Sequence, residues 1–196
     1  MNLAIAAREL AEFLKESGVL YAIAGGFALQ YWGEPRLTRD LDVTVLVPQE
    51  QLPGFLDFAL KRFRPRLPDA KDFALKHRVL LVETEAGVPI DVSLGIPGYE
   101  EEALKRAVIR DVPEAGRLPL LSAEDLIIHK CVAGRARDME DVLGILLRQR
   151  LKLDLDLIRH WLKEFQPAVE THDPLECFEA LLREAEKAAG GEMPSA

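Results

Sequence analysis

The sequence predicts an α/β core followed by a bundle of helices, and three observations support this fold class. Short apolar runs with strand character alternate with segments of helical periodicity up to about residue 121. After that residue only helical patterns follow, with no long linker. The chain has 196 residues, 48% hydrophobic and 30% charged, which is enough for a sizeable core. We therefore expect a core over residues 1–121, a helical region over 122–189 packed on it, and a disordered tail over 190–196.

The core region contains the patterns of both helices and strands. Apolar residues at helical spacing predict helices over residues 3–15, 27–32, 52–63 and 100–106. Apolar runs predict strands over residues 20–24, 40–47, 78–84, 88–94, 108–112 and 119–121. Gly18 ends the first helix, Pro48 ends the second strand, and residues 64–72 are expected to form a proline-rich loop. The runs 78–84 and 88–94 predict a β-hairpin.

The helical region begins with a capping signal. Ser122 followed by Asp125 is a capping-box variant that starts a helix over 123–133. Further helices are expected over residues 138–148, 155–165 and 174–188. Asp173 is the expected N-cap of the last one, and Pro174 occupies the first position that proline prefers.

Composition restricts the classes of function. A net charge of −8 argues against nucleic-acid binding through a general basic surface, but it leaves room for RNA held by a local basic patch. No apolar run approaches the roughly 20 residues of a membrane span, so we expect a cytoplasmic protein without membrane contact. Cys131 and Cys177 lie in apolar helical contexts and are expected to be reduced.

Three carboxylates and a glycine turn are the candidate chemical site. Asp40 and Asp42 alternate with apolar residues in one predicted strand, so both project from the same face. Asp91 lies in another strand between two β-branched residues. Three such carboxylates can hold two divalent metals about 4 Å apart, the arrangement used in phosphoryl transfer. The turn Gly25-Gly26 lies between a strand and a helix, where backbone N–H groups can receive phosphate.

These residues carry a resemblance. Gly25-Gly26, then Arg36-x-Thr38-x-Asp40-x-Asp42, then Ile90-Asp91-Val92 resembles the DNA polymerase β-like nucleotidyltransferase superfamily. The later segments 124–130 and 135–141 are similar to the branch that contains AbiE-type toxins and uncharacterised relatives. The resemblance implies a nucleotidyltransferase-like α/β core with a small mixed sheet and flanking helices. It also implies transfer of a nucleoside monophosphate from an NTP to an acceptor hydroxyl, with release of pyrophosphate.

The resemblance also implies roles for the metal site. Asp40 and Asp42 would coordinate both metals, which are two Mg²⁺ or Mn²⁺ ions, and Asp91 would complete the site of the metal that activates the acceptor hydroxyl. The acceptor is left open between an RNA 3′ end such as that of tRNA, a protein hydroxyl and a small molecule. For a toxin-like relative, a cognate antitoxin is an expected partner.

The resemblance assigns a second group of residues to the nucleotide. The members of this group are Gly25, Gly26, Arg36, Thr38, Lys130 and Asp138, with Asp141 as the alternative to Asp138. Many relatives have a serine where this chain has Gly26, so phosphate contact here would rest on backbone amides. Lys130 would reach the phosphates.

Each assignment has a structural alternative. Asp40 and Asp42 would otherwise be solvated or paired with Arg36 or Arg39, and Asp91 would belong to a buried ion pair. Lys130 would only snorkel from a core helix, and Asp138 would be an N-cap. For the whole chain, the alternative is a catalytically silent nucleotide-binding or partner-binding module. A P-loop is excluded because no Gly-Lys-Ser/Thr follows the glycines.

Overall fold

The computed structural model describes residues 2–149 and 152–190, which form two compact units. The first unit contains residues 2–28 and 37–121, and the second contains 29–36 and the chain from 122 onward. The helices of the first unit are α1 (Leu3–Glu16), α3 (Leu52–Arg62), α4 (Ala70–His77) and α5 (Tyr99–Lys105). Its strands are β1 (Leu20–Ile23), β2 (Leu41–Leu46), β3 (Arg64–Pro65), β4 (Val79–Glu83), β5 (Pro89–Leu94), β6 (Val108–Val112) and β7 (Gly116–Leu120). Helix α2 (Gly25–Trp32) has residues in both units.

The strands form one mixed sheet in the order β3-β4-β5-β2-β1-β7-β6. β2 is antiparallel to β1 and parallel to β5, and β1 is parallel to β7. The outer pairs, β3 with β4, β4 with β5 and β6 with β7, are antiparallel. This mixed sheet with flanking helices confirms the predicted fold class.

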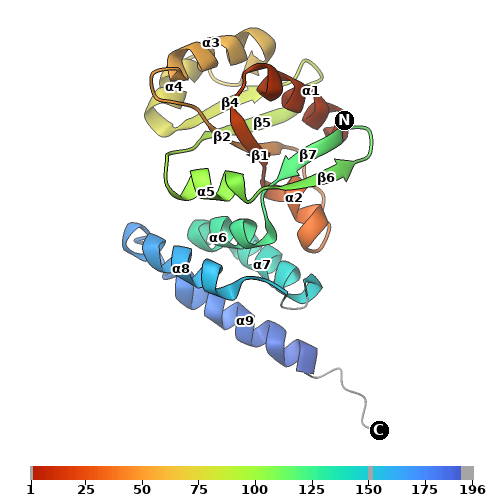
Figure 1. Ribbon diagram of the computed structural model, residues 1–196, viewed down its shortest axis with the longest axis vertical. Helices are drawn as coiled ribbons and strands as arrows, with labels where there is room; N and C mark the ends of the chain where they lie inside the picture. The colour runs from red at the N-terminus through yellow and green to blue at the C-terminus, as the bar shows by residue number, and fades with distance from the viewer. Residues whose placement is uncertain (1, 150–151, 191–196) are drawn as a thin grey trace. The chain divides into compact units, whose positions relative to one another are not determined.

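The two faces of the sheet differ in burial. In β5, Ile90, Val92 and Leu94 are buried, whereas Asp91 is intermediate and Ser93 is exposed. Helices α1, α3 and α4 lie on one side of the sheet and α5 lies on the other (Figure 1). Apolar and polar residues alternate because side chains of a strand point to opposite faces. The acids of β2 and β5 therefore belong to the less buried face.

Residues 64–72 were predicted as a loop, and the structure corrects this. Arg64–Pro65 form the edge strand β3, and α4 begins at Ala70. Proline is tolerated on an edge strand because the missing N–H is not needed for pairing on the open side. Helix α4 buries only Ala70 and Ala74, too small an apolar stripe to stand out in the sequence.

The second unit contains four helices in its described part: α6 (Ala123–Ala133), α7 (Ala136–Arg148), α8 (Leu155–Phe165) and α9 (Pro174–Gly190), with a 3₁₀ turn, η1 (Gln166–Ala168). Ser122 caps α6 as predicted, because its Oγ accepts the N–H of Asp125 at 3.0 Å. The end of α2 is attached to α7: Arg148 donates to the carbonyl of Gln30 and Gln149 to that of Trp32. Residues 29–36 therefore belong with the helices. Residues 191–196 of the predicted tail lie outside the described residues.

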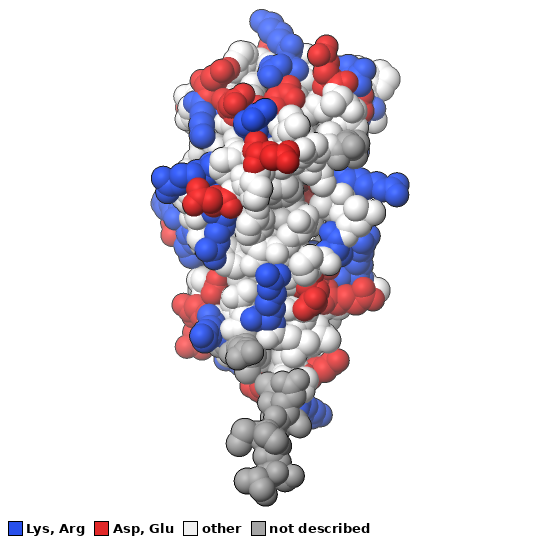
Figure 2. All heavy atoms as spheres, turned by 90° about the vertical axis from the view of Figure 1, so that its right-hand side faces the viewer, with Lys and Arg blue, Asp and Glu red and all other residues white. Residues whose placement is uncertain are grey.

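The surface carries both charges. On the face drawn in Figure 2, basic and acidic side chains are interspersed. Within the described ranges, none of the helices has the length and apolar content needed to cross a membrane. The two cysteines, Cys131 and Cys177, are both free thiols.

Candidate active site

Asp42 and Asp91 lie side by side on neighbouring strands. In the parallel pair β2–β5, Asp42 is in register with Asp91, so both side chains leave the same face of the sheet. Two ionised carboxylates about 5 Å apart repel each other by roughly 3 kcal/mol at an effective dielectric constant of about 20. Such a pair is stable only where cations or hydrogen bonds offset the repulsion.

Gly25 provides the space that the Asp42 carboxylate occupies. A Cβ on Gly25 would collide with the carboxylate of Asp42, and Gly25 has a φ of +55°, a conformation that L side chains rarely adopt. The N–H of Ala24 donates to the Asp42 carbonyl at 2.8 Å, which fixes the turn against β2. Any side chain at this position would displace Asp42. Gly26 follows in the first turn of α2 and is buried.

Asp40 precedes β2 and has a local partner. The Thr38 hydroxyl donates to Asp40 Oδ1 at 2.7 Å, and Thr38 itself is buried. Thr38, predicted to bind nucleotide, thus orients a predicted metal ligand. Arg36, one of the alternative partners that the sequence offers for Asp40, donates to both carboxylate oxygens of Asp141.

Arg66, which the sequence did not single out, is bonded to Asp91. Its Nη1 donates to Asp91 Oδ1, and both side chains are about one-third exposed, at 32% and 34%. The predicted alternative of an ion pair at Asp91 is therefore present, although it is only half-buried. Arg66 lay in the supposed loop 64–72, and only the pairing of β3 with β4 brings it near Asp91.

The carboxylates form a pair rather than a cluster of three. Within residues 2–149 and 152–190, no three His, Cys, Asp or Glu side chains are grouped so that they could hold a metal ion. The carboxylate oxygens of Asp42 and Asp91 are the donor type that a hard divalent cation such as Mg²⁺ prefers. Asp40 lies just before the start of β2, so the alternation of side chains along a strand does not place it with Asp42.

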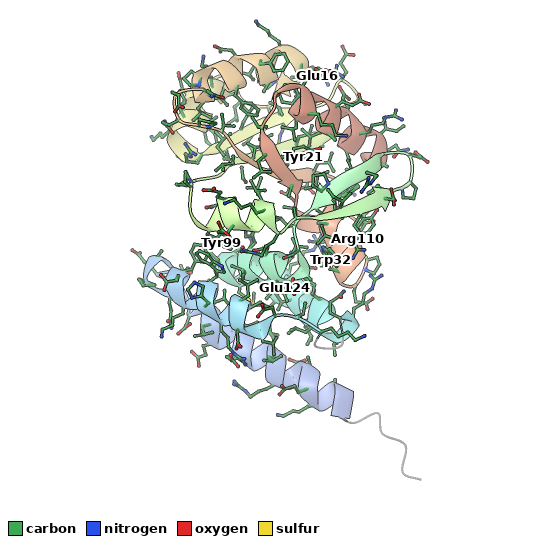
Figure 3. The ribbon with its side chains drawn as sticks, in the orientation of Figure 1. Glu16, Tyr21, Trp32, Tyr99, Arg110 and Glu124 are labelled. Atoms are coloured by element: carbon green, nitrogen blue, oxygen red, sulfur yellow. The ribbon has the colours of Figure 1, made fainter. Side chains whose placement is uncertain are left out.

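Tyr21 lies on the opposite face from this pair. It is in register with Val45, which is fully buried. Figure 3 labels the Tyr21 side chain on β1. Burial raises the pKa of Tyr21, and among the described residues its hydroxyl has no hydrogen-bond partner. This phenol therefore belongs to the core.

A second charged cluster lies in the second unit and contains three predicted site residues. Arg36 donates to both oxygens of Asp141, Nε to Oδ1 at 2.8 Å and Nη2 to Oδ2 at 2.9 Å. Lys130 also donates to Asp141 Oδ2, at 2.5 Å, and to Asp138 Oδ1 at 3.2 Å. The side chain of Lys130 is only 7% exposed and that of Asp141 5%. Lys130 is thus held between two carboxylates.

The charges within this cluster determine the protonation of Asp141. Burial acts to raise the pKa of Asp141, but the hydrogen bonds from Arg36 and Lys130 outweigh it, so the pKa lies below its ordinary value of 3.8. Asp138 is in the first turn of α7, after Arg135 at the N-cap position, so it is not the N-cap. The Oδ2 atom of Asp138 is buried and has no hydrogen bond to any residue that the structure describes, and Arg135 Nε lies 3.2 Å away. His129 is half-buried, and the loss of solvation around its ring lowers its pKa.

A cavity of about 760 Å³ lies at the other end of the strands. Its lining includes Leu20 at the start of β1, Leu46 at the end of β2, and Arg78. The acids lie where β2 begins and beyond the end of β1. The cavity is therefore separate from the carboxylate pair.

A known protein family matches most of the chain. The sequence pattern of the family described as "Nucleotidyl transferase AbiEii toxin, Type IV TA system" matches residues 10–190. No curated protein sequence matches the chain.

The similarity to one solved structure, with a TM-score above 0.5, supports the fold. An antigenic nucleotidyltransferase-like protein from Paracoccidioides brasiliensis superimposes with a TM-score of 0.53 at 16% identity, over 96% of this chain and 90% of that one. The antibiotic-resistance factor ANT(2'')-Ia gives a TM-score of 0.42 at 16% identity, over 95% and 92% of the two chains. The Thermotoga maritima CCA-adding enzyme, complexed with tRNA, gives 0.42 at 12% identity, over 97% of this chain and 53% of that one.

Proposed function

The chain belongs to the nucleotidyl transferase AbiEii toxin family, and we propose that it transfers a nucleoside monophosphate from an NTP to an acceptor hydroxyl. The bond between the acceptor oxygen and the α-phosphorus forms, the bond from the α-phosphorus to the bridging oxygen breaks, and pyrophosphate leaves. The observation that carries this proposal is the carboxylate pair Asp42 and Asp91, in register on parallel strands beside the bare backbone of Gly25.

The carboxylates would hold the cations of the reaction. We assign two Mg²⁺ or Mn²⁺ ions to Asp40, Asp42 and Asp91. When bound, these ions would supply positive charge for the phosphates and lower the pKa of the attacking hydroxyl. The Thr38 hydroxyl keeps Asp40 oriented. We assign to Asp91 the acceptance of the hydroxyl proton.

The remaining predicted residues are assigned to the nucleotide. Gly25 and Gly26 lie in the first turn of α2, whose N–H groups lack partners within the helix and suit a phosphate. The further proposed contacts are Arg36, Thr38, Lys130 and Asp138. Arg36 and Lys130 both donate hydrogen bonds to Asp141. They would therefore bind a phosphate only through N–H groups that are not used in these bonds.

The acceptor and the partner follow from the class of protein. An RNA 3′ end, a protein hydroxyl and a small-molecule hydroxyl are the candidate acceptors, and a toxin of a type IV system has an antitoxin as its natural partner. The acceptor must bring its oxygen to the less buried face of the sheet, where the acids are.

The alternative function is a catalytically silent nucleotide-binding or partner-binding module. The ion pair of Arg66 with Asp91 favours it, because this bond uses one oxygen of a proposed metal ligand. A silent module would bind NTP but transfer nothing.

Label transfer distinguishes the two functions. Each of the four α-³²P-labelled NTPs is incubated with Mg²⁺ and with total tRNA, cell protein or a panel of small hydroxyl compounds. We expect wild type to label one acceptor class, and Asp40→Ala and Asp42→Asn to lose at least about a hundredfold in rate, as expected when transition-state electrostatics are removed. Asp111→Asn, an exposed aspartate of β6, is the matched control and should retain full activity.

The outcomes are distinct. Equal labelling by wild type and Asp42→Asn would contradict the proposal. NTP binding by calorimetry without transfer to any acceptor class would instead support the silent module.

A further inference from the structure

A row of side chains runs across four strands on the less buried face of the sheet. In this row, Asp42 on β2 is in register with Asp91 on β5, and Asp91 is in register with Leu81 on β4. Beyond the end of β3, the N–H of Arg66 donates to the Leu81 carbonyl at 3.0 Å and extends the pairing by one residue. Arg66 is thus the next member of the row, two strands from Asp91.

The Arg66 side chain spans the Leu81 position to reach Asp91. Strands are about 4.8 Å apart, so the reach over one intervening strand is close to 10 Å between backbones. Only a long side chain can bridge that distance, and the guanidinium places Nη1 on Asp91 Oδ1. Arg64, two residues earlier on the same face, has a closer partner: its Nη2 lies 2.9 Å from Glu83 Oε1, directly opposite on β4.

The Arg66–Asp91 bond differs from an ordinary surface ion pair because a second carboxylate, Asp42, lies beside it. A half-exposed pair alone contributes little to stability. Here the acid is one of two adjacent carboxylates, and the guanidinium offsets their mutual repulsion. The same positive charge opposes a second cation nearby, and the bond occupies an oxygen that a cation would use.

We propose that Arg66 is the counter-ion of the Asp42–Asp91 pair and sets its affinity for divalent cations. Arg66 stays on Asp91 until a cation takes over that oxygen. The inference rests on the proposed function, which gives these carboxylates their cations. It makes Arg66 a positioning residue that acts through Asp91.

One consequence concerns the order of loading. A cation that binds without nucleotide has to displace the Arg66 guanidinium from Asp91 by itself. A cation that binds together with a nucleoside triphosphate is accompanied by negative charge, which offsets the charge of the guanidinium. The acidic pair should therefore bind metal weakly alone and much more tightly with nucleotide.

Metal binding without catalysis tests the inference. Free Mn²⁺ is measured by electron paramagnetic resonance during titration of the full chain, with wild type, Arg66→Gln and the matched control Arg64→Gln. We expect Arg66→Gln to bind Mn²⁺ at least about threefold more tightly than wild type, since a unit charge is removed near the cation. Arg64→Gln should stay within about twofold of wild type, and Arg66→Lys, which keeps the charge, should retain the weaker binding.

One further variant background and one further condition test whether Arg66 acts through Asp91. In an Asp91→Asn background, Arg66→Gln should produce no gain, because the acid through which Arg66 acts is no longer charged. With a non-hydrolysable NTP analogue present, the gap between wild type and Arg66→Gln should shrink. Circular dichroism and thermal melting check that the three arginine variants fold alike.

The results decide as follows. Equal Mn²⁺ affinity in wild type and Arg66→Gln would overturn the inference. Weaker Mn²⁺ binding by Arg66→Gln would overturn it too, because Arg66 would then be shown to help Asp91 bind the metal. Neither result would contradict the proposed nucleotidyl transfer. Absence of Mn²⁺ binding in all variants, with and without the NTP analogue, would overturn the metal dependence of the proposed function and the inference with it.

Discussion

At the scale of single residues, Gly25 carries two constraints at once. Its backbone has a φ of +55°, and the position of its missing Cβ is filled by the Asp42 carboxylate. Several other glycines of the chain share the first constraint, and Gly18, with a φ of +65°, has open space where its Cβ would be. Comparing substitutions at Gly25 and Gly18 therefore separates the effect of the contact with Asp42 from the effect of backbone strain.

Gly25→Ala should therefore lower the unfolding free energy more than Gly18→Ala does. The left-handed conformation alone costs an alanine about 1 kcal/mol, which is the loss of unfolding free energy expected for Gly18→Ala. Gly25→Ala adds the displacement of Asp42, so we expect a loss of roughly 2 kcal/mol or more together with a loss of nucleotidyl transfer. Urea denaturation and the label-transfer assay measure both. Equal behaviour of the two variants would show that Asp42 does not depend on Gly25.

At the scale of secondary-structure elements, one buried carboxylate joins three segments. Asp141 on α7 receives Lys130 from α6 and Arg36 from the segment after α2. These side chains come from distant parts of the sequence, and two of them, Lys130 and Asp141, are almost fully buried. Breaking such a network leaves cations without a counter-charge, which costs far more than losing a surface pair.

Asp141→Ala should lower the unfolding free energy by about 3–5 kcal/mol. The control is Asp156→Ala on α8, whose side chain is 99% exposed and 3.8 Å from its arginine partner, and which should change stability by less than about 0.5 kcal/mol. Denaturant unfolding at pH 7 provides both values. Similar losses in the two variants would mean that the buried network adds no stability.

At acidic pH, the difference in unfolding free energy between wild type and Asp141→Ala should become smaller. Since the pKa of Asp141 in the folded chain is lowered from 3.8, its contribution is fully present above that ordinary value. The contribution is lost as the pH falls through the folded pKa. A gap in unfolding free energy that stayed constant from pH 7 to about pH 2 would contradict this assignment.

At the scale of the whole molecule, charge limits what the chain can bind. The net charge is −8, and basic and acidic residues are mixed on the face drawn in Figure 2. Non-specific affinity for nucleic acid grows with the number of phosphates that cations neutralise. An RNA acceptor would have to be held by a few local contacts.

RNA binding without nucleotide should therefore be weak. We expect a Kd above about 10 μM for mixed tRNA at physiological salt, where even basic proteins bind nucleic acid non-specifically at roughly 1–100 μM. Filter binding at two salt concentrations measures the affinity and its salt dependence. Submicromolar binding with a steep salt dependence would indicate a basic surface that the charge distribution does not suggest.

The amino-acid sequence determined those parts of the fold and the site that depend on local patterns. Alternation around Asp42 and Asp91 predicted their strands, the Ser122 cap predicted the start of α6, and the motif order predicted the family, all of which the structure or the family match confirms. These features could be predicted because side-chain periodicity and capping act over a few residues.

Only the tertiary structure decided how distant segments pair. It placed Asp42 beside Asp91 in parallel register and brought Arg66 onto Asp91. It also showed that Lys130, expected at a phosphate, is bonded to Asp141 and Asp138. The Arg66–Asp91 and Arg36–Asp141 pairs join residues 25 and 105 positions apart, so they depend on strand order and helix packing, which no local pattern encodes. The sequence therefore predicted the candidate acids, and the fold determined which basic side chains are bonded to Asp91 and Asp141.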